Sequence, residues 1–230
     1  MNKVNWKATL EKYRNRFAVS GIDLSSVSDL TCVGHLIPHP DDWEKVDVIL
    51  RTWCPESKIY DTANKYRDQY QAWHKQGWLE VTDGNAIDYD YVRARVVEDA
   101  RILKIDSIGV DRLFQGYEFC MKLNDELGGT EKDPKVIACG MGYLSMAGPC
   151  QEFERRLLEK KINHGGNPIL RFMADSVAVR KDPAGNMKPD KDKSQGKIDG
   201  IVVILLALDR LMRQKPPQKS KYEAEGISAI

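Results

Sequence analysis

Three aspartates stand where apolar segments of the chain meet a loop or a helix start. Asp23 ends an apolar run, Asp111 ends the segment IDSIGVD, and Asp199 opens an apolar helix after a lysine-rich loop. A carboxylate beside a core segment is costly unless it is paired or coordinated. Three converging carboxylates would repel one another and need a cation between them. Mg²⁺ and Mn²⁺ favour such hard oxygen ligands.

A metal centre held by converging carboxylates of this kind could cleave a phosphodiester. Two divalent ions roughly 3.5–4 Å apart can activate a water molecule and stabilise the leaving oxygen. In this hypothesis Asp23 bridges both ions, and Asp111 and Asp199 each complete one side. Spacing does not prove convergence, and each residue has a structural alternative. Asp199 could accept bonds from amides at a helix start, and Asp23 from the serine turn that follows it. Asp111 could pair with Arg112.

Two further residues could assist such a site. Asp29 lies six residues after Asp23, across an expected hairpin, and is either an auxiliary ligand or an ordinary turn carboxylate. His164 stands in the segment NHGGNP, beside glycines that allow a close backbone approach. It could act near a scissile phosphate, but a structural role in the loop is favoured. Asn167, just before Pro168, is expected to cap a following helix.

Four lysines cluster in the loop before Asp199: Lys188, Lys191, Lys193 and Lys197. A lysine run is usually only solvated surface, but this one adjoins the proposed site. Lysines there could contact DNA phosphates without reading bases, which predicts low sequence specificity. Asp190 and Asp192 dilute the patch, so modest affinity is expected.

The composition sets limits on the class of protein. Lys plus Arg is 35 and Asp plus Glu is 34, so net charge gives no argument for nucleic acid. The five cysteines lack CxxC spacing, which argues against a disulfide framework or a zinc site. The N-terminus has no signal-peptide pattern, and the longest apolar stretch, 198–208, is too short to span a bilayer. We expect a reduced, cytoplasmic protein without membrane contact.

The elements that must position the aspartates follow from the apolar patterns. Three strands joined by polar turns predict an antiparallel meander, at 17–24, 30–38 and 46–53. Later strands are expected at 105–111, 134–140 and 176–180, and helices at 58–76, 89–103, 114–127, 150–161 and 198–213. This order predicts an α/β fold, in which three antiparallel strands precede parallel strands and helices flank both faces of the mixed sheet.

The chain length of 230 residues suits one sizeable α/β domain. We expect that domain to cover residues 1–214. The segment 215–230 carries prolines and lysines and is expected to be a flexible tail.

The segments that carry these aspartates resemble the nuclease domain of the large terminase subunit of tailed bacteriophages. GIDLSSVSDLT resembles its opening strand and turn, and IDSIGVD its second metal-carboxylate strand. The long block HGGNPILRFMADSVAVRKDPAGNMKPDKDKSQGKIDGIVVILLAL resembles its C-terminal block and is highly specific. The similarity extends from about Val19 to Leu211. It implies an RNase H-like fold and two-metal cleavage of double-stranded DNA with Mg²⁺ or Mn²⁺, with Asp23, Asp111 and Asp199 as metal ligands.

Three positions depart from the family pattern. Arg112 stands where proline is frequent, Met141 where glutamine is common, and Ser176 where asparagine is often found. These departures bear on local DNA contacts rather than on the metal site.

The resemblance also implies a biological setting. The family cuts concatemeric genomes at the start and end of packaging, in the cytoplasm of the bacterial host. In a full terminase the partners would be the ATPase domain, the small terminase subunit and the portal. No GxxxxGK[ST] phosphate loop occurs in this chain. We therefore expect an isolated nuclease domain that does not hydrolyse ATP alone.

Two other functions stay open at this point. One is a structure-selective RNase H-like nuclease of the junction-resolvase type, which would prefer branched DNA. The other is a non-catalytic packaging adaptor that uses its carboxylates structurally and shows neither metal dependence nor cleavage.

Overall fold

Runs rich in valine, isoleucine, leucine and threonine form the first three strands of the protein. They are β1 (Phe17–Asp23), β2 (Thr31–Pro38) and β3 (Val46–Pro55). The three strands pair antiparallel, and every residue of β2 and β3 is buried. The expected meander is thereby confirmed.

The computed structural model describes residues 3–24, 30–112 and 116–216. The expected turn that holds Asp29 lies outside the described residues. So does most of the expected tail, from residue 217 onward.

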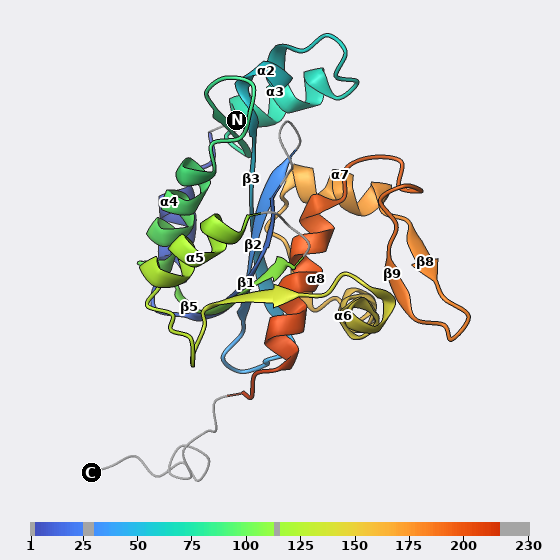
Figure 1. The fold of residues 1–230 in the computed structure, drawn as a ribbon. Helices are drawn as coiled ribbons and strands as arrows, with labels where there is room; N and C mark the ends of the chain where they lie inside the picture. Colours follow the sequence, from blue (N-terminus) through green and yellow to red (C-terminus); the bar gives the residue numbers. More distant parts are fainter. Residues whose placement is uncertain (1–2, 25–29, 113–115, 217–230) are drawn as a thin grey trace.

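The remaining strands extend the meander into a mixed sheet (Figure 1). The order is β4-β3-β2-β1-β5-β6, and β7 pairs with the beginning of β3. The added strands run parallel to their neighbours: β4 (Leu79–Thr82), β5 (Lys104–Asp111), β6 (Val136–Cys139) and β7 (Ile162–Asn163). The expected combination of antiparallel and parallel strands is confirmed.

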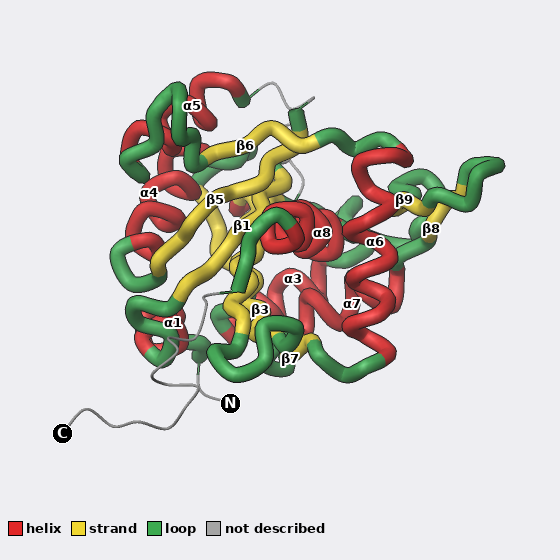
Figure 2. Tube along the Cα trace, turned by 90° about the horizontal axis from the view of Figure 1, so that it is seen from below, coloured by secondary structure: helices red, strands yellow, loops and turns green. Residues whose placement is uncertain are grey.

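Helices cover both faces of the sheet, as Figure 2 shows in a view along the layers. One face carries α6 (Tyr143–Leu158), α7 (Pro168–Ser176) and α8 (Asp199–Met212). The other carries α1 (Trp6–Glu11), α4 (Tyr89–Ala100) and α5 (Tyr117–Glu126). As expected, Asn167 caps α7, because its side-chain oxygen accepts from two backbone N–H groups.

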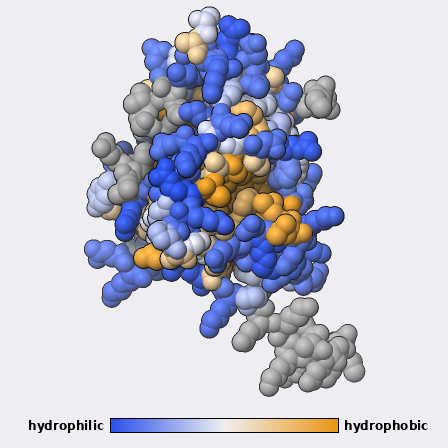
Figure 3. All heavy atoms as spheres, turned by 90° about the vertical axis from the view of Figure 1, so that its right-hand side faces the viewer, coloured by the Kyte–Doolittle hydropathy of each residue, from blue (hydrophilic) through white to orange (hydrophobic). Residues whose placement is uncertain are grey.

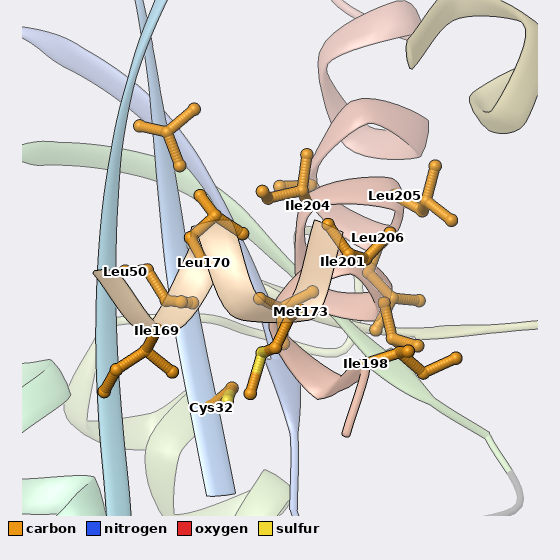
Figure 4. Close-up of a cluster of buried hydrophobic side chains, with 14 of the residues drawn as sticks. Cys32, Leu50, Ile169, Leu170, Met173, Ile198, Ile201, Ile204, Leu205 and Leu206 are labelled. Atoms are coloured by element: carbon orange, nitrogen blue, oxygen red, sulfur yellow. The ribbon is translucent and has the colours of Figure 1, made fainter. Parts of the chain in front are cut away.

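Within the described residues, no helix has the length and apolarity needed to cross a membrane. The most apolar helix is α8, which packs against β1, β2 and β5. Figure 4 shows its isoleucine and leucine side chains meeting those of α7 and the sheet. Because α8 is buried almost all round, its position is set by packing rather than by an amphipathic face.

A row of glycines lets α8 lie close to the sheet. Gly21 on β1 is flanked by Gly34 on β2 and Gly109 on β5. A Cβ atom at Gly21 would lie 2.0 Å from the backbone oxygen of Val203, and one at Gly109 would lie 2.9 Å from that of Leu206. Only residues without a side chain permit this approach. The glycine row therefore fixes the height and direction of α8 over the sheet.

The expected helix at 58–76 was wrong, because it is two helices. They are α2 (Glu56–Tyr60) and α3 (Arg67–Gln76). Between them, Asp61 and Asn64 accept hydrogen bonds from the backbone N–H groups of Ala63 and Tyr66, at 2.9 and 3.0 Å. Such local bonds compete with helical ones and break the helix.

The expected strand at 176–180 was also wrong in its bounds, and part of the expected loop before Asp199 is a strand. The helix α7 continues to Ser176, and β8 (Val179–Lys181) pairs with β9 (Met187–Pro189) in a protruding hairpin. Gly185, at φ 84°, supplies the left-handed backbone conformation in its turn.

The helix expected at 150–161 begins seven residues earlier, at Tyr143. Pro149 lies inside it, and its missing N–H removes one helical hydrogen bond. The Pro149 side chain is buried, and α6 packs on α8, so tertiary contacts outweigh the proline signal.

Candidate metal centre

Asp23 is the last residue of β1, and Asp199 is the first residue of α8. Side chains alternate between the faces of a strand, so Asp23 shares the face of Gly21, on which α8 packs. From Val203, above Gly21, to Asp199 the helix axis rises about 6 Å. From Gly21 to Asp23 the strand rises about 6.7 Å. The glycine contact therefore brings both carboxylates to the same level.

Asp111 ends the neighbouring strand β5, which runs parallel to β1. Their register sets Ile22 beside Val110, so the next residue on each strand stands at the same carboxyl edge of the sheet. Ligands of open α/β sheets commonly bind outside this edge. The fold thus brings all three predicted aspartates to one end of the sheet.

Lys191 lies between two of these aspartates. Its ammonium nitrogen is 2.9 Å from Asp23 Oδ2 and 3.3 Å from Asp199 Oδ1. The Lys191 side chain is 56% exposed, whereas those of Asp23 and Asp199 are 12% and 11% exposed. The ammonium therefore covers the carboxylates from the solvent side.

Burial and neighbouring charges shift the pKa values of Asp23 and Lys191. Burial is the largest influence on the pKa of Asp23 and raises it from 3.8 to about 6. The Lys191 ammonium lowers this pKa, whereas the charges of Asp199 and Asp111 raise it further. Burial lowers the pKa of Lys191, but the two carboxylates outweigh this influence, and its pKa is raised. The Lys191 ammonium does not return the pKa of Asp23 to its ordinary value.

The donor atoms fit a hard divalent cation. Asp199 Oδ2 is buried and has no hydrogen-bond partner. No group of three or more His, Cys, Asp or Glu side chains in the described part of the chain is arranged to hold a metal ion. A cationic nitrogen instead lies beside the carboxylates. Mg²⁺ or Mn²⁺ could coordinate Asp199 Oδ2, the buried oxygen without a partner, beside the Lys191 ammonium.

The loop that carries Lys191 is held in place by Asp190. This carboxylate is buried, and its Oδ2 accepts from Arg180 Nε at 2.8 Å. Its Oδ1 accepts from the backbone N–H groups of Asp192 and Lys193. The sequence suggested that Asp190 dilutes a basic patch, but in the structure it anchors the loop. No signal in the sequence pointed to its burial.

The other predicted lysines occupy different places on the hairpin and loop. The ammonium of Lys188, on β9, lies 5.1 Å from the centre of the Tyr143 ring. Lys193 is exposed, and Lys197 is partly buried near the start of α8. Lys191 contacts Asp23 and Asp199, which no pattern in the sequence indicated.

The structure does not bring His164 to the aspartates. It follows β7, which pairs with the beginning of β3, whereas Asp23 is level with the end of β3, because it pairs with Cys32, which pairs with Thr52. His164 lines a groove of about 500 Å³ with side chains of α6, α7 and α8. Figure 3 shows apolar atoms gathered on that side of the molecule. Burial and the charge of Arg171 lower the pKa of His164, which favours its neutral form.

A second buried polar cluster lies on the opposite face of the sheet. Ser20 Oγ is 2.8 Å from His35 Nδ1, and His35 Nε2 is 3.2 Å from Asp99 Oδ2. This order of residues could suggest a nucleophile with its base. All three residues are at most 2% exposed, so no substrate reaches the hydroxyl. We interpret the cluster as structural.

Comparison with known proteins places the chain in a family. Residues 7–215 match the family model described as "Terminase large subunit, endonuclease domain". The large terminase subunit of Enterobacteria phage HK97 is 30% identical over 189 residues, which cover 82% of this chain and 36% of that protein. Protein YmfN of Escherichia coli (strain K12) is 25% identical over 245 residues, covering 100% of this chain and 52% of that protein. The chain thus spans about a third to a half of these relatives.

Solved structures agree with this placement. The HK97 large terminase superposes with a TM-score of 0.73 at 27% identity, covering 91% of this chain and 43% of that one. The large terminase nuclease of thermophilic phage G20c, solved with bound magnesium, gives 0.53 at 9% identity, covering 84% and 80%. The second likeness shows the fold alone, and the expected RNase H-like fold is confirmed. The chain belongs to the family of terminase large subunit endonuclease domains.

Proposed function

We propose that the chain is a metal-dependent endonuclease that cuts double-stranded DNA with low sequence specificity during viral genome packaging. One observation carries the proposal. Asp23 and Asp199, from opposite ends of the chain, share a single ammonium at 2.9 and 3.3 Å. Asp199 Oδ2 is buried and has no hydrogen-bond partner, so it is an oxygen that a cation could take as a ligand.

In this proposal Asp23, Asp111 and Asp199 hold Mg²⁺ or Mn²⁺, two ions in the full site. When bound, such ions activate a water molecule and stabilise the leaving 3′ oxygen of a phosphodiester. The bound magnesium of the phage G20c nuclease supports the choice of metal. Asp29 stays a possible auxiliary ligand, outside the described residues. His164 is assigned a role in its loop, because the structure holds it away from the carboxyl edge.

The hairpin and the following loop are proposed to hold the DNA backbone. Lys188 lies on β9, and Lys191, Lys193 and Lys197 lie between β9 and the start of α8, where Lys191 contacts Asp23 and Asp199. Contacts from lysines to phosphates carry no sequence information, which accounts for low specificity.

We assign the nuclease domain to residues 1–214, which the family match over 7–215 supports. In a complete terminase this domain would act with the ATPase domain, the small terminase subunit and the portal in the host cytoplasm. These partners are inferred from the family.

The direct test is plasmid cleavage by the wild type and by Asp23→Asn. We expect cleavage with Mg²⁺ or Mn²⁺ but not with EDTA. We expect Asp23→Asn to lose activity by at least about a thousandfold, because the lost carboxylate serves the transition state. The matched control is Asp68→Asn, which changes an 84%-exposed carboxylate on α3 and should retain full activity.

Two outcomes would overturn the proposal. Full cleavage by a folded Asp23→Asn protein would remove the assigned site. Absence of any metal-dependent cleavage by the wild type would favour a packaging adaptor. Cleavage of branched DNA far above linear duplex would instead support a structure-selective nuclease.

A further inference from the structure

The ammonium of Lys191 is bonded to carboxylates, whereas a lysine that binds DNA would direct its ammonium at a phosphate. Its ammonium donates hydrogen bonds to carboxylate oxygens of Asp23 and Asp199. These are the oxygens that the proposed function assigns to a metal ion. The ammonium and a metal ion cannot both bind Asp23 Oδ2 and Asp199 Oδ1 in this way. We infer that Lys191 is an internal stand-in cation, which holds the carboxylates together without metal and leaves when a divalent ion enters.

The need for such a cation follows from charge. Asp23 and Asp199 are buried at the carboxyl edge, and Asp111 stands beside them. Without a cation, like charges in a partly dry site would drive the end of β1 and the start of α8 apart. The ammonium is one positive charge, and it leaves Asp199 Oδ2 unpartnered. A divalent ion offers more charge and more coordination positions, so it competes effectively.

The surrounding contacts allow the side chain to leave while the loop stays in place. Asp190 anchors the backbone on both sides of Lys191 through Arg180 and two backbone N–H groups. The hydroxyl of Ser194 also donates to the backbone oxygen of Asp190 at 2.6 Å. Lys191 itself has a flexible four-carbon stem, and more than half of its side chain is exposed. Its ammonium can therefore swing outward, toward the side from which a DNA backbone would approach.

This inference rests on the proposed metal site, and metal binding tests it without any cleavage. Mn²⁺ is titrated calorimetrically into the metal-free wild type and into Lys191→Met, which keeps the chain length and removes the charge. Two partly exposed ion pairs no longer compete, so we expect Lys191→Met to bind Mn²⁺ about tenfold more tightly. Lys191→Arg keeps a cation and should bind Mn²⁺ at least as weakly as the wild type.

The matched control is Lys45→Met, because the Lys45 side chain is 55% exposed and lies at a loop before β3. It should bind Mn²⁺ like the wild type. Equal or weaker binding by a folded Lys191→Met protein would overturn the inference. If the wild type binds no divalent ion at all, the proposed metal site itself fails, which is a distinguishable result.

A measurement on the wild type covers the case in which Lys191→Met does not fold. Acetylation of Lys191 by an amine-reactive ester is followed by mass spectrometry, with and without Mn²⁺. Release from two carboxylates should make Lys191 at least several-fold more reactive when Mn²⁺ is present, while Lys45 keeps its rate. An unchanged or slower rate at Lys191 would contradict its displacement.

Discussion

The two faces of strand β1 carry buried charge in opposite ways. Toward α4, Asp99 has both carboxylate oxygens paired, Oδ1 with Arg51 at 2.7 Å and Oδ2 with His35 at 3.2 Å. Toward α8, Asp23 and Asp199 share one ammonium, and Asp199 Oδ2 has no hydrogen-bond partner. The first cluster is electrically complete, and the second is not.

The difference distinguishes a structural cluster from a binding site. Arg51 also bonds to Glu80 Oε1 at 2.6 Å and lies over the rings of Trp6 and Trp53. This network connects the sheet to α1 and α4 and leaves no charge for a ligand to neutralise. The carboxyl edge keeps unsatisfied negative charge at the solvent boundary. Burial alone does not indicate function, whereas an unpartnered carboxylate oxygen beside a second buried carboxylate points to a cation site.

The largest loss of stability is expected from breaking the network of Arg51 with Asp99 and Glu80. Arg51→Met would leave the buried Asp99 without its cation and remove the Arg51 partner of the partly buried Glu80, which should lower the free energy of unfolding by about 3–5 kcal/mol. Urea denaturation measures the change. The control Arg14→Met removes an exposed ion pair with Glu11 and should cost at most about 1 kcal/mol. A loss as small in Arg51→Met would show that this network does not stabilise the fold.

A smaller loss of stability, together with weaker metal binding, is expected from a substitution in the glycine row. In Gly21→Ala the new Cβ would collide with the backbone of Val203, so α8 must move. We expect about 2–3 kcal/mol lower stability and weaker Mn²⁺ binding, because Asp199 moves with α8. Gly142→Ala is the control, since a Cβ there meets nothing within 4 Å. Unchanged Mn²⁺ affinity in Gly21→Ala would show that the glycine row does not position the metal ligands.

The smallest effect is expected at the carboxyl edge, where a substitution should raise the stability rather than lower it. The folded pKa of Asp23 is about 6, above its ordinary 3.8, so its ionised form destabilises the metal-free fold at pH 8. This cost begins to fall as the pH drops below about 6 and is gone only below 3.8, the ordinary pKa of the group. Asp23→Asn should therefore be more stable than the wild type at pH 8 by on the order of 1 kcal/mol, and the gain should shrink by pH 5.

Thermal unfolding in EDTA at the two pH values measures this difference. A mutant clearly less stable than the wild type at pH 8 would mean that Asp23 is as well paired as Asp99. The contrast between the two clusters would then be lost.

Much of the fold follows from local patterns in the sequence. The meander was predictable because its strands are continuous apolar runs between polar turns, and α8 because its apolar run is long. The break between α2 and α3 was missed, because the bonds made by Asp61 and Asn64 depend on side-chain geometry. The hairpin of β8 and β9 was missed because each strand has only three residues.

The aspartates were identifiable from their positions at strand and helix ends, but their convergence was not. That convergence depends on the register of Gly21, Gly34 and Gly109, which lie far apart in sequence. The place of Lys191 depends in turn on the burial of Asp190, which no local pattern indicates. Long-range packing thus decides the site.

Anomalous diffraction from crystals containing Mn²⁺ tests the central claim most directly. We expect anomalous density within about 2–2.2 Å of carboxylate oxygens of Asp23 and Asp199, with Asp111 completing the site and the Lys191 ammonium moved away. Saturating Mn²⁺ with no density at this edge, and Lys191 still between Asp23 and Asp199, would contradict it.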